Sequence, residues 1–490
     1  MIQFNNIPST KRTPGALVEI DNSRALKGLF ANPHKALIIG LKDGTSGTAA
    51  NAALNAITSD SLADGFFGAG SIAARMCKTF KQNNPNTELY AMALSGGTVR
   101  ASAYMSFAGS VTAAGAYVFL LIGGQKVYSP VTSGWSHIDV ASGVASDINA
   151  NAQLCCVASV STAGGFRFLA KGSCSLGNQF DVRANFYDGQ TNPTGLTWVL
   201  SNFAGGAGAP SVGDVWTIID DIQFQHIINP FNDSTNLAAM ANELEDRFGP
   251  QVDKQGHCWT AYRGALASCA LIGNSMNSPH VTIVGLEASP TNPDEWCAAW
   301  GAVAADKLND DPGRPLQYLK LKGVIAPAET GRWTNSERES LLYDGIATFF
   351  VDSSGNVMME RAITTYKTNA AGVLDGSYLD SETLFILMEI RYQFKATMLT
   401  RFISQRYKLA DDTFPVQAGM MVATPKTIKQ EIISLFTKLH QKGLIENLDD
   451  FITNLLVERN ASDVNRIDVL LPPDLINQFR VLAGQIQFIL

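Results

Sequence analysis

The spacing of hydrophobic positions along the chain predicts an α/β core that is interrupted and later resumes. Residues 35–40 form an apolar run typical of a buried strand, residues 71–82 have helical spacing, and residues 88–94 indicate a second strand. The resumed pattern predicts strands at 224–228 and 281–284 and helices at 236–248, 293–308 and 336–344, the last capped by Asn335 or Ser336. It also predicts a hairpin of 347–351 with 357–362. Such alternation is typical of α/β proteins.

Between the two halves of this pattern the chain changes character. From about residue 95 to residue 199 it is rich in Gly, Ser, Thr and Ala, and a flexible Gly-rich run follows at 203–210. Short strands are expected at 116–122, 126–128, 166–169 and 180–186, with one helix at 147–154. We therefore expect a β-rich inserted domain at 97–205 within a middle domain made of 26–96 and 206–362.

The last third of the chain is more helical and more charged. Helices are expected over residues 381–406 and 426–441, with a short one from 447 to 451, before a Pro-Pro pair at 472–473. These signals predict a C-terminal domain at 363–476. The fold class is thus a multidomain α+β or α/β protein, with an α/β core, a β-rich insert and a helix-plus-sheet C-terminal domain.

Both ends of the chain alternate polar and apolar residues as strands do. Residues 477–490 and residues 1–25 are expected to be extended arms, and no turn or second strand lies close enough to pair with them. The apolar positions that would carry strand docking are Ile2, Phe4, Leu17, Val18, Ile20, Ile486, Phe488 and Leu490. Periodicity alone favours pairing within the same chain, but addition to a neighbouring subunit's sheet is the alternative.

Composition narrows the class of protein without identifying it. The 490 residues are 46% hydrophobic and 17% charged, with 42 glycines, which describes a folded protein that can bury surface against partners. A net charge of −7 argues against a general nucleic-acid binder. With no basic-then-apolar start and no apolar run of spanning length, we expect a soluble, cytosolic product without membrane insertion. The seven scattered cysteines are expected to be buried thiols.

A search for chemistry finds no catalytic, cofactor or metal constellation. Residues 68–73 match G-x-G-x-x-A, but a turn-like stretch rather than a strand precedes them, so the glycines are interpreted as packing residues. The loop at 40–48 lacks the Gly-Lys-Ser/Thr ending of a phosphate loop. The six histidines are far apart, and no G-x-S-x-G is present. We expect a non-enzyme that needs no cofactor.

One basic cluster stands out in this acidic chain. It lies in and after the predicted helix 381–406 and consists of Arg391, Lys395, Arg401, Arg406 and Lys408. A solvated helix face and a surface for an acidic partner explain the cluster equally well.

Several ordered motifs resemble the tail sheath proteins of Mu-like contractile-tailed phages. They are TTYKTN (364–369), SYLD (377–380), KLADD (408–412), VATPK (422–426), ERNA (458–461), DVLLPP (468–473) and, near the start, EIDNSRA (19–25). The resemblance covers residues 1–95 and 220–490 strongly and the insert weakly. One departure is Ile489, where a basic residue is expected.

The resemblance implies a homo-oligomer rather than an isolated subunit. It implies a virion sheath of stacked hexameric rings around a tail tube, with baseplate and tail terminator proteins as further partners, assembled in the host cytoplasm. It also implies that the terminal arms exchange between subunits, that the C-terminal domain faces the tube with its basic cluster, and that the insert points outward. The sheath of a domesticated phage-tail-like bacteriocin remains an alternative, as does an α/β enzyme with a β-rich appendage.

Overall fold

The computed structural model describes residues 15, 28–161, 164–417 and 419–489, which fall into two compact units. The large unit comprises residues 33–389 together with the segment that starts at Asn477. The small unit comprises residues 390–476 together with the described residues up to Asn32. Both units mix helices and strands, which confirms the predicted fold class, while the finer domain boundaries drawn from the sequence stay predictions.

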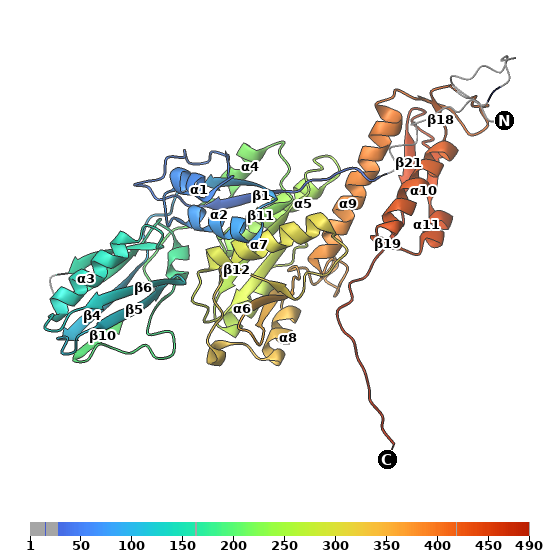
Figure 1. Ribbon diagram of the computed structural model, residues 1–490. Helices are drawn as coiled ribbons and strands as arrows, with labels where there is room; N and C mark the ends of the chain where they lie inside the picture. Colours follow the sequence, from blue (N-terminus) through green and yellow to red (C-terminus); the bar gives the residue numbers. More distant parts are fainter. Residues whose placement is uncertain (1–14, 16–27, 162–163, 418, 490) are drawn as a thin grey trace. The chain divides into compact units, whose positions relative to one another are not determined.

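A nine-stranded sheet forms the centre of the large unit (Figure 1). Its strands, in spatial order, are β14 (Leu319–Lys320), β16 (Val357–Arg361), β15 (Ile346–Val351), β13 (Val281–Leu286), β12 (His257–Arg263), β11 (His226–Ile228), β1 (Lys35–Gly40), β3 (Glu88–Ala93) and β2 (Asn55–Ala56). The six strands from β15 to β3 run parallel. A parallel sheet is covered on both faces, which explains the continuous apolar run of β1.

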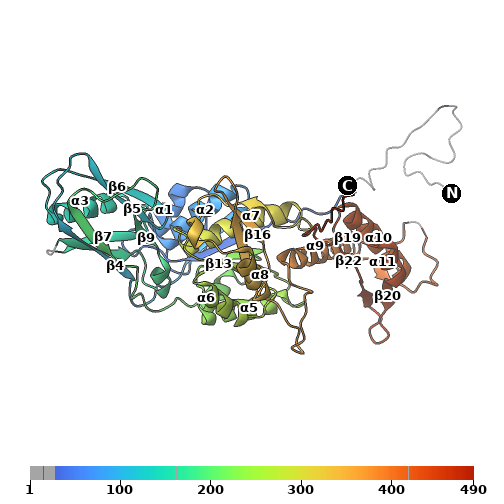
Figure 2. The same ribbon diagram turned by 90° about the horizontal axis from the view of Figure 1, so that it is seen from below.

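Helices cover both faces of this sheet, as Figure 2 shows. One face carries α1 (Asp60–Phe67), α2 (Ile72–Asn83) and α7 (Pro293–Asp310); the other carries α5 (Ser234–Phe248) and α6 (Leu266–Asn274). Shorter helices are α4 (Gly213–Ile219), η2 (Glu329–Gly331) and α8 (Asn335–Tyr343). The cap of α8 is Thr334, not Asn335 or Ser336, because Thr334 forms a reciprocal capping box with Glu337.

Two smaller antiparallel sheets follow β3 in the chain. One is ordered β10 (Leu196–Leu200), β4 (Ser102–Gly109), β8 (Gly165–Ala170) and β7 (Cys156–Ser161); the other is β6 (Gln125–Val131), β5 (Ala116–Ile122) and β9 (Val182–Ala184). The helix beside them, α3 (His137–Ala150), begins ten residues before the predicted 147–154. The prediction was wrong because it missed the capping box of Ser136 with Asp139, which starts the helix. A 3-10 turn, η1 (Ser175–Gln179), precedes β9.

Helix α9 (Ser381–Met398) begins in the large unit and ends in the small one. The predicted helix to residue 406 changes into a π-helical turn over Leu399–Ile403. The rest of the small unit consists of α10 (Pro425–Gln441), α11 (Leu448–Asn454) and three two-stranded sheets. The strand pairs are β17 (Lys408–Leu409) with β18 (Val422–Ala423), β19 (Ile445–Glu446) with β22 (Asp474–Leu475), and β20 (Leu456–Arg459) with β21 (Ile467–Leu470).

Each unit has its own apolar core. In the large unit nearly every residue of α7 is buried, including Trp296 and Trp300. In the small unit the apolar side of α10 packs on α11, where the rings of Phe436 and Phe451 stack with their centroids 4.0 Å apart. All seven cysteines are buried free thiols, as predicted.

Candidate inter-subunit surfaces

The segment Val481–Ile489 is extended and makes no strand pairing with the described chain. Its apolar side chains are almost fully exposed: Ile486 at 93%, Phe488 at 78% and Ile489 at 99%. Figure 1 shows this segment as a single extended ribbon. The predicted strand therefore does not form within the described part of the chain, because no sheet edge lies beside it. A contiguous row of exposed apolar residues is the mark of an interaction site.

The remaining predicted arm residues lie outside what the structure describes. They are Ile2, Phe4, Leu17, Val18, Ile20 and Leu490. Their role stays a prediction.

The hairpin of β20 and β21 has two strands only among the described residues, so both outer edges keep unpaired backbone groups. Its register pairs Leu456 with Leu470 and Val457 with Val469. The outermost side chains, Leu456 and Leu470, are both exposed. Asn460 fixes the turn by accepting the backbone N–H groups of two following residues. Such an edge can accept a further strand.

A groove of about 560 Å³ lies along the same hairpin within the small unit. Its apolar lining includes Ile467 and Val469 of β21 and Phe394 of α9, and Arg466 and Asp468 of the same hairpin add charged groups. A strand added to the edge of β21 would project alternate side chains towards this groove. Apolar residues two positions apart, as Ile486 and Phe488 are, match that requirement.

The sequence reasoning missed β20 and β21 as strands. The signal was present, because the alternating LVER and IDVL segments flank a turn-like stretch that contains Asn460 and Asp463.

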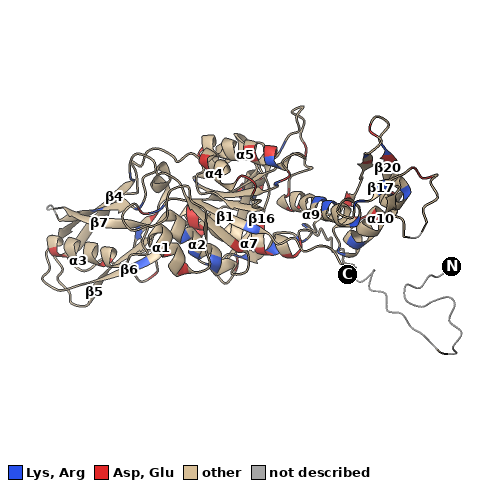
Figure 3. Ribbon diagram, turned by 90° about the horizontal axis from the view of Figure 1, so that it is seen from above, with Lys and Arg blue, Asp and Glu red and all other residues tan. Residues whose placement is uncertain are grey.

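The predicted basic cluster is spread over three local structures. Arg391 and Lys395 lie one turn apart on α9, and neither is free of interactions within the chain. Arg401 lies in the π-helical turn, where its Nε is 3.2 Å from Oε1 of Glu431 on α10. Basic residues on α9 and α10 are visible in Figure 3.

The last two members of the cluster follow the helix. Arg406 is exposed and has a left-handed backbone with φ of 58°. Lys408 is exposed on β17. The structure thus brings Arg391 and Lys395 together, ties Arg401 to a carboxylate, and leaves Arg406 and Lys408 exposed in the following loop and strand.

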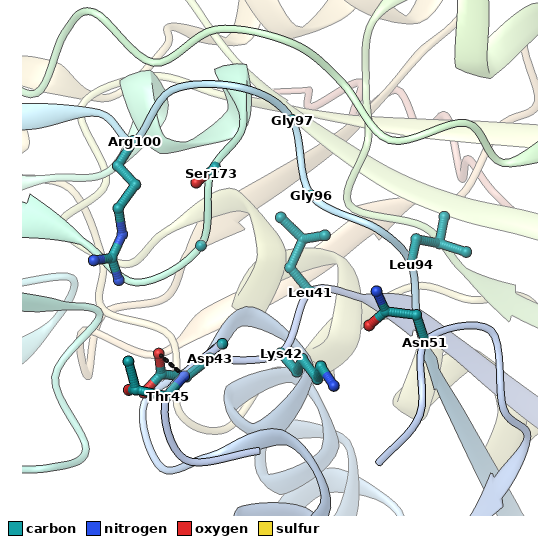
Figure 4. Close-up of a pocket in the computed structure, with 12 residues that line it drawn as sticks. Leu41, Lys42, Asp43, Thr45, Asn51, Leu94, Gly96, Gly97, Arg100 and Ser173 are labelled. Atoms are coloured by element: carbon teal, nitrogen blue, oxygen red, sulfur yellow. Dashed lines mark hydrogen bonds between the residues drawn. The ribbon is translucent and has the colours of Figure 1, made fainter. Parts of the chain in front are cut away.

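A cavity of about 380 Å³ lies at the carboxyl ends of β1 and β3, where α/β proteins often bind ligands (Figure 4). The polar groups of the loop at residues 42–46 are engaged within that loop or with the segment that follows it. Nζ of Lys42 donates to the carbonyl of Ala49 at 2.6 Å, and the hydroxyls of Thr45 and Ser46 donate to Asp43, each at 2.8 Å. Burial alone would raise the pKa of Asp43, but these hydrogen bonds outweigh it and lower the pKa.

The glycines near this cavity serve backbone packing, as the sequence suggested. A Cβ on Gly40 would lie 2.8 Å from Cα of Ala73, so glycine lets β1 approach α2 closely. Gly68 and Gly70 both have positive φ, and a Cβ on Gly70 would lie 2.2 Å from the carbonyl oxygen of Leu154.

Ionisable groups are also buried between α2 and α7. The guanidinium of Arg75 forms a very short ion pair with Asp294, and its Nε is 3.6 Å from Oε2 of Glu295. Burial raises the pKa of Glu295 to about 8, against the opposing effect of Arg75. Glu295 is therefore largely protonated at neutral pH. Burial also raises the pKa of Asp294, and the direct ion pair with Arg75 acts against that rise. The arrangement cross-links two helices.

No metal-binding cluster of three or more His, Cys, Asp or Glu side chains occurs among residues 28–161, 164–417 and 419–489. Over the same residues, no helix combines the length and apolarity that a membrane span requires.

Comparison with known proteins finds related domains over more than half of the chain. Residues 205–365 match the phage tail sheath protein central domain, and residues 374–489 match the phage tail sheath C-terminal domain. The chain is 34% identical over 491 residues to the Mu-like prophage FluMu tail sheath protein of Haemophilus influenzae, and the match covers all of both proteins.

Solved structures share the fold at low sequence identity. A sheath tail protein from Desulfitobacterium hafniense has a TM-score of 0.51 at 14% identity, covering 95% of this chain and 97% of the other. The sheath tail protein Lin1278 from Listeria innocua has a TM-score of 0.50 at 12% identity, covering 93% and 95%.

The full-length relative and the matched domains define the class as a structural protein of contractile tails. The chain belongs to the phage tail sheath family, of the Mu-like kind. It is a structural subunit of a contractile tail sheath and hence a component of the virion.

Proposed function

We propose that this subunit polymerises into stacked hexameric rings around a tail tube, joined by strands exchanged between subunits. The observation that carries the proposal is the exposed, unpaired segment Val481–Ile489, whose apolar side chains have no cover within the described chain. A neighbour's β20–β21 hairpin supplies what the segment lacks, namely an open strand edge beside a groove with a largely apolar lining.

The energy of one such joint is moderate. Each backbone hydrogen bond contributes about 0.5–1.5 kcal/mol net. Burial of Ile486 and Phe488 contributes about 1.5–3 kcal/mol each before the cost of ordering the arm. A joint of this strength holds when it is repeated over a lattice, while the extended chain beside it can bend as rings rotate.

On this proposal the arms act as hinged tethers. Contraction changes the contacts between rings without dissociating them and drives the tube through the host envelope. The N-terminal residues 1–25 serve as the second arm. The insert 97–205 faces outward, and the C-terminal domain faces the tube. The tube protein, the baseplate and the tail terminator are the further partners, with assembly in the host cytoplasm.

We infer that the subunit is not an enzyme and acts without a cofactor or direct nucleic-acid contact. In the cavity at β1 and β3, Lys42 and Asp43 are hydrogen-bonded to neighbouring residues of the chain, and the buried cluster at Arg75 lies between two helices. A phage sheath and the sheath of a domesticated bacteriocin would use the same subunit chemistry.

Deleting residues 485–490 tests the strand exchange. We expect the truncated protein to stay soluble and folded, with an unchanged melting temperature, but to form no tubes in electron micrographs. A double substitution, Ile486→Ser with Phe488→Ser, should act like the deletion, because it removes the two side chains that point the same way.

The matched control changes the polar residues between them. Gln485→Ala with Gln487→Ala should leave assembly intact. Normal tubes from the truncated protein would refute strand exchange through this arm, and discrete particles from the unaltered protein would refute a sheath.

A further inference from the structure

The exposed arm starts abruptly after Arg480, a residue held firmly by its own subunit. Nη2 of Arg480 lies 3.0 Å from Oδ1 of Asp380 and 2.8 Å from Oε1 of Glu382, and Nη1 lies 3.3 Å from Oε1 of Gln317. The side chain of Arg480 is only 13% exposed. All of these residues belong to the large unit.

The backbone beside Arg480 is tied as well. Nε2 of Gln317 donates to the carbonyl of Phe479 at 3.1 Å, while the ring of Phe479 points outward and is 71% exposed. Exposure alternates here, with Gln478 and Arg480 turned inward and Phe479 turned outward. From Val481 onward every described residue is exposed.

The receptor for Arg480 has contacts of its own. Asp380 accepts both a 2.9 Å bond from Nε and a 2.9 Å bond from Nη2 of Arg361, at the end of β16. Glu382, in the first turn of α9, is fully buried and also accepts the backbone N–H of Leu316 at 2.6 Å. Asp380 and Glu382 together form a specific socket for the guanidinium of Arg480, because a buried carboxylate is stable when a cation lies against it.

Burial raises the pKa of Glu382, and the Arg480 guanidinium acts against that rise. Removing Arg480 would take away the positive charge that offsets the burial of Glu382. The contact therefore stabilises both Arg480 and Glu382 in their places.

We propose that Arg480 anchors the C-terminal arm to its own subunit, so that only Val481–Leu490 takes part in strand exchange. This inference rests on the proposed exchange of arms. Ten extended residues reach at most about 33–36 Å. The anchor therefore sets the greatest distance between the socket of one subunit and the receiving edge of its neighbour. It also keeps the arm short, which raises its effective concentration at that edge.

Proteolysis of the isolated subunit tests the anchor directly. Arg480 is the only Lys or Arg between Asn477 and Leu490, so trypsin can remove Val481–Leu490 only by cutting there. We expect slow loss of this peptide from the unaltered subunit. In the double variant Asp380→Asn with Glu382→Gln the socket loses its charge and keeps its shape, and cleavage should be at least about tenfold faster, because cleavage follows the population of the open form.

A spin label gives a second readout without touching the socket. The native cysteines are all buried, so a cysteine introduced at the exposed Phe479 can be labelled selectively. The label should be immobile in the unaltered background and mobile with Arg480→Gln, whereas a label at Gln485 should be mobile in both. The matched control is Arg466→Gln, which removes an exposed guanidinium paired with Asp468 and should leave both signals unchanged.

Equal cleavage of the unaltered and socket-altered subunits, or equal mobility of the 479 label with and without Arg480, would overturn the anchor. Both readouts use the unassembled subunit, so they decide the anchor even if the protein forms no sheath. In assembly, Arg480→Gln should lower the yield of regular tubes at least severalfold while the subunit stays folded. Full yield of regular tubes with a freed arm root would show that the anchor does not position the arm.

Discussion

At the scale of single residues, four histidines lie along the amino-terminal edge of the parallel sheet. His34 and His280 precede β1 and β13, while His226 and His257 begin β11 and β12 in matching register. The indole N–H of Trp259 donates to Nδ1 of His226 at 3.2 Å. Nδ1 must therefore be an unprotonated acceptor, and the neutral ring donates from Nε2 to Nδ1 of His34 at 3.0 Å. The network requires His226 to be neutral.

Acid should weaken the large unit through these rings. Burial lowers the pKa of His226, His257 and His280 below 6.5. Below about pH 6.5 these histidines take up protons in the unfolded chain but stay neutral in the folded chain. Their contribution to the free energy of unfolding is therefore fully present above that pH and is lost as the pH falls towards the folded pKa values. Each group contributes up to about 1.4 kcal/mol per pH unit in that window.

Melting temperatures between pH 7.5 and pH 5 measure this dependence. His257→Gln keeps a partner for the hydroxyl of Thr282, which lies 2.8 Å from His257, and should give a shallower fall than the unaltered protein. Changing the exposed His440 to Gln is the control and should preserve the slope. The same slope in the His257 variant would contradict the assignment.

Residue-scale prediction from sequence succeeded where a residue's own neighbours decide its environment. The cysteines lie in apolar stretches, and all are buried. It failed where distant segments meet. Arg480 is 100 residues from Asp380, and no local pattern shows that the two pair. The histidine row likewise forms only because parallel strands align their starts.

At the element scale, α2 and α7 are joined by the Arg75 cluster rather than by apolar contacts alone. A buried charge without its partner is far more costly than the intact pair. The two carboxyl groups therefore differ in role, since Asp294 makes the direct ion pair with Arg75, while burial raises the pKa of the neighbouring Glu295 to about 8.

Substitutions in this cluster should act in opposite directions. Arg75→Met leaves Asp294 buried without a cation and should destabilise the large unit by about 3–5 kcal/mol. Glu295 has a folded pKa of about 8 and an ordinary value of 4.5, so it costs stability as the pH rises from 4.5 to 8. Glu295→Gln should remove that cost, with a gain of about 1–3 kcal/mol near pH 8 and little change near pH 4.5. Urea unfolding midpoints at both pH values measure the two effects. A loss of stability in the Gln variant at pH 8 would contradict the protonated Glu295.

Helix α9 contacts the described chain close to both predicted arms. Its first turn holds Arg480 through Glu382. Further along, the side-chain amide of Gln393 makes reciprocal hydrogen bonds of 2.8 and 2.7 Å with the backbone of Phe30, near residue 28, from which the structure describes the chain continuously to residue 161. Within the large unit α9 thus holds the residue before the C-terminal arm, and within the small unit it holds Phe30.

Elements with strong local signals were predictable, and weakly signalled ones were not. Strand β1 and helix α10 follow from an apolar run and from a Thr-Pro start with helical spacing. The hairpin β20–β21 is short and half exposed, so its alternation is weak. The start of α3 depends on one capping box, and the arm at 481–489 alternates like a strand but lacks an edge to pair with.

At the scale of the whole molecule, the chain combines a rigid sheet, a small unit with open edges and an unpaired arm. On the proposed strand exchange these features serve a polymer, because each exposed feature finds its complement on an identical copy. On the same proposal the arm contacts survive contraction. The proposed contacts with a tube would instead hold the extended sheath and then release it, which favours many weak, exposed charges over a few strong ones.

The basic residues of α9 are our candidates for that releasable contact with an acidic tube. Exposed ion pairs contribute only about 0–1 kcal/mol each, and salt screens them beyond about 8 Å at physiological strength. We expect Arg391→Glu with Lys395→Glu to reduce extended sheath on tubes and to favour empty, contracted-like sheath. High salt should produce a milder form of the same change in the unaltered protein.

Since both residues already interact within the chain, melting temperatures must show that the variant is folded. Arg314→Glu with Lys320→Glu, at two exposed positions of the large unit, makes the same change in net charge and should assemble normally. Extended tails from the α9 variant at both low and high salt would move the tube contact elsewhere, with the lysines of α10 next in line.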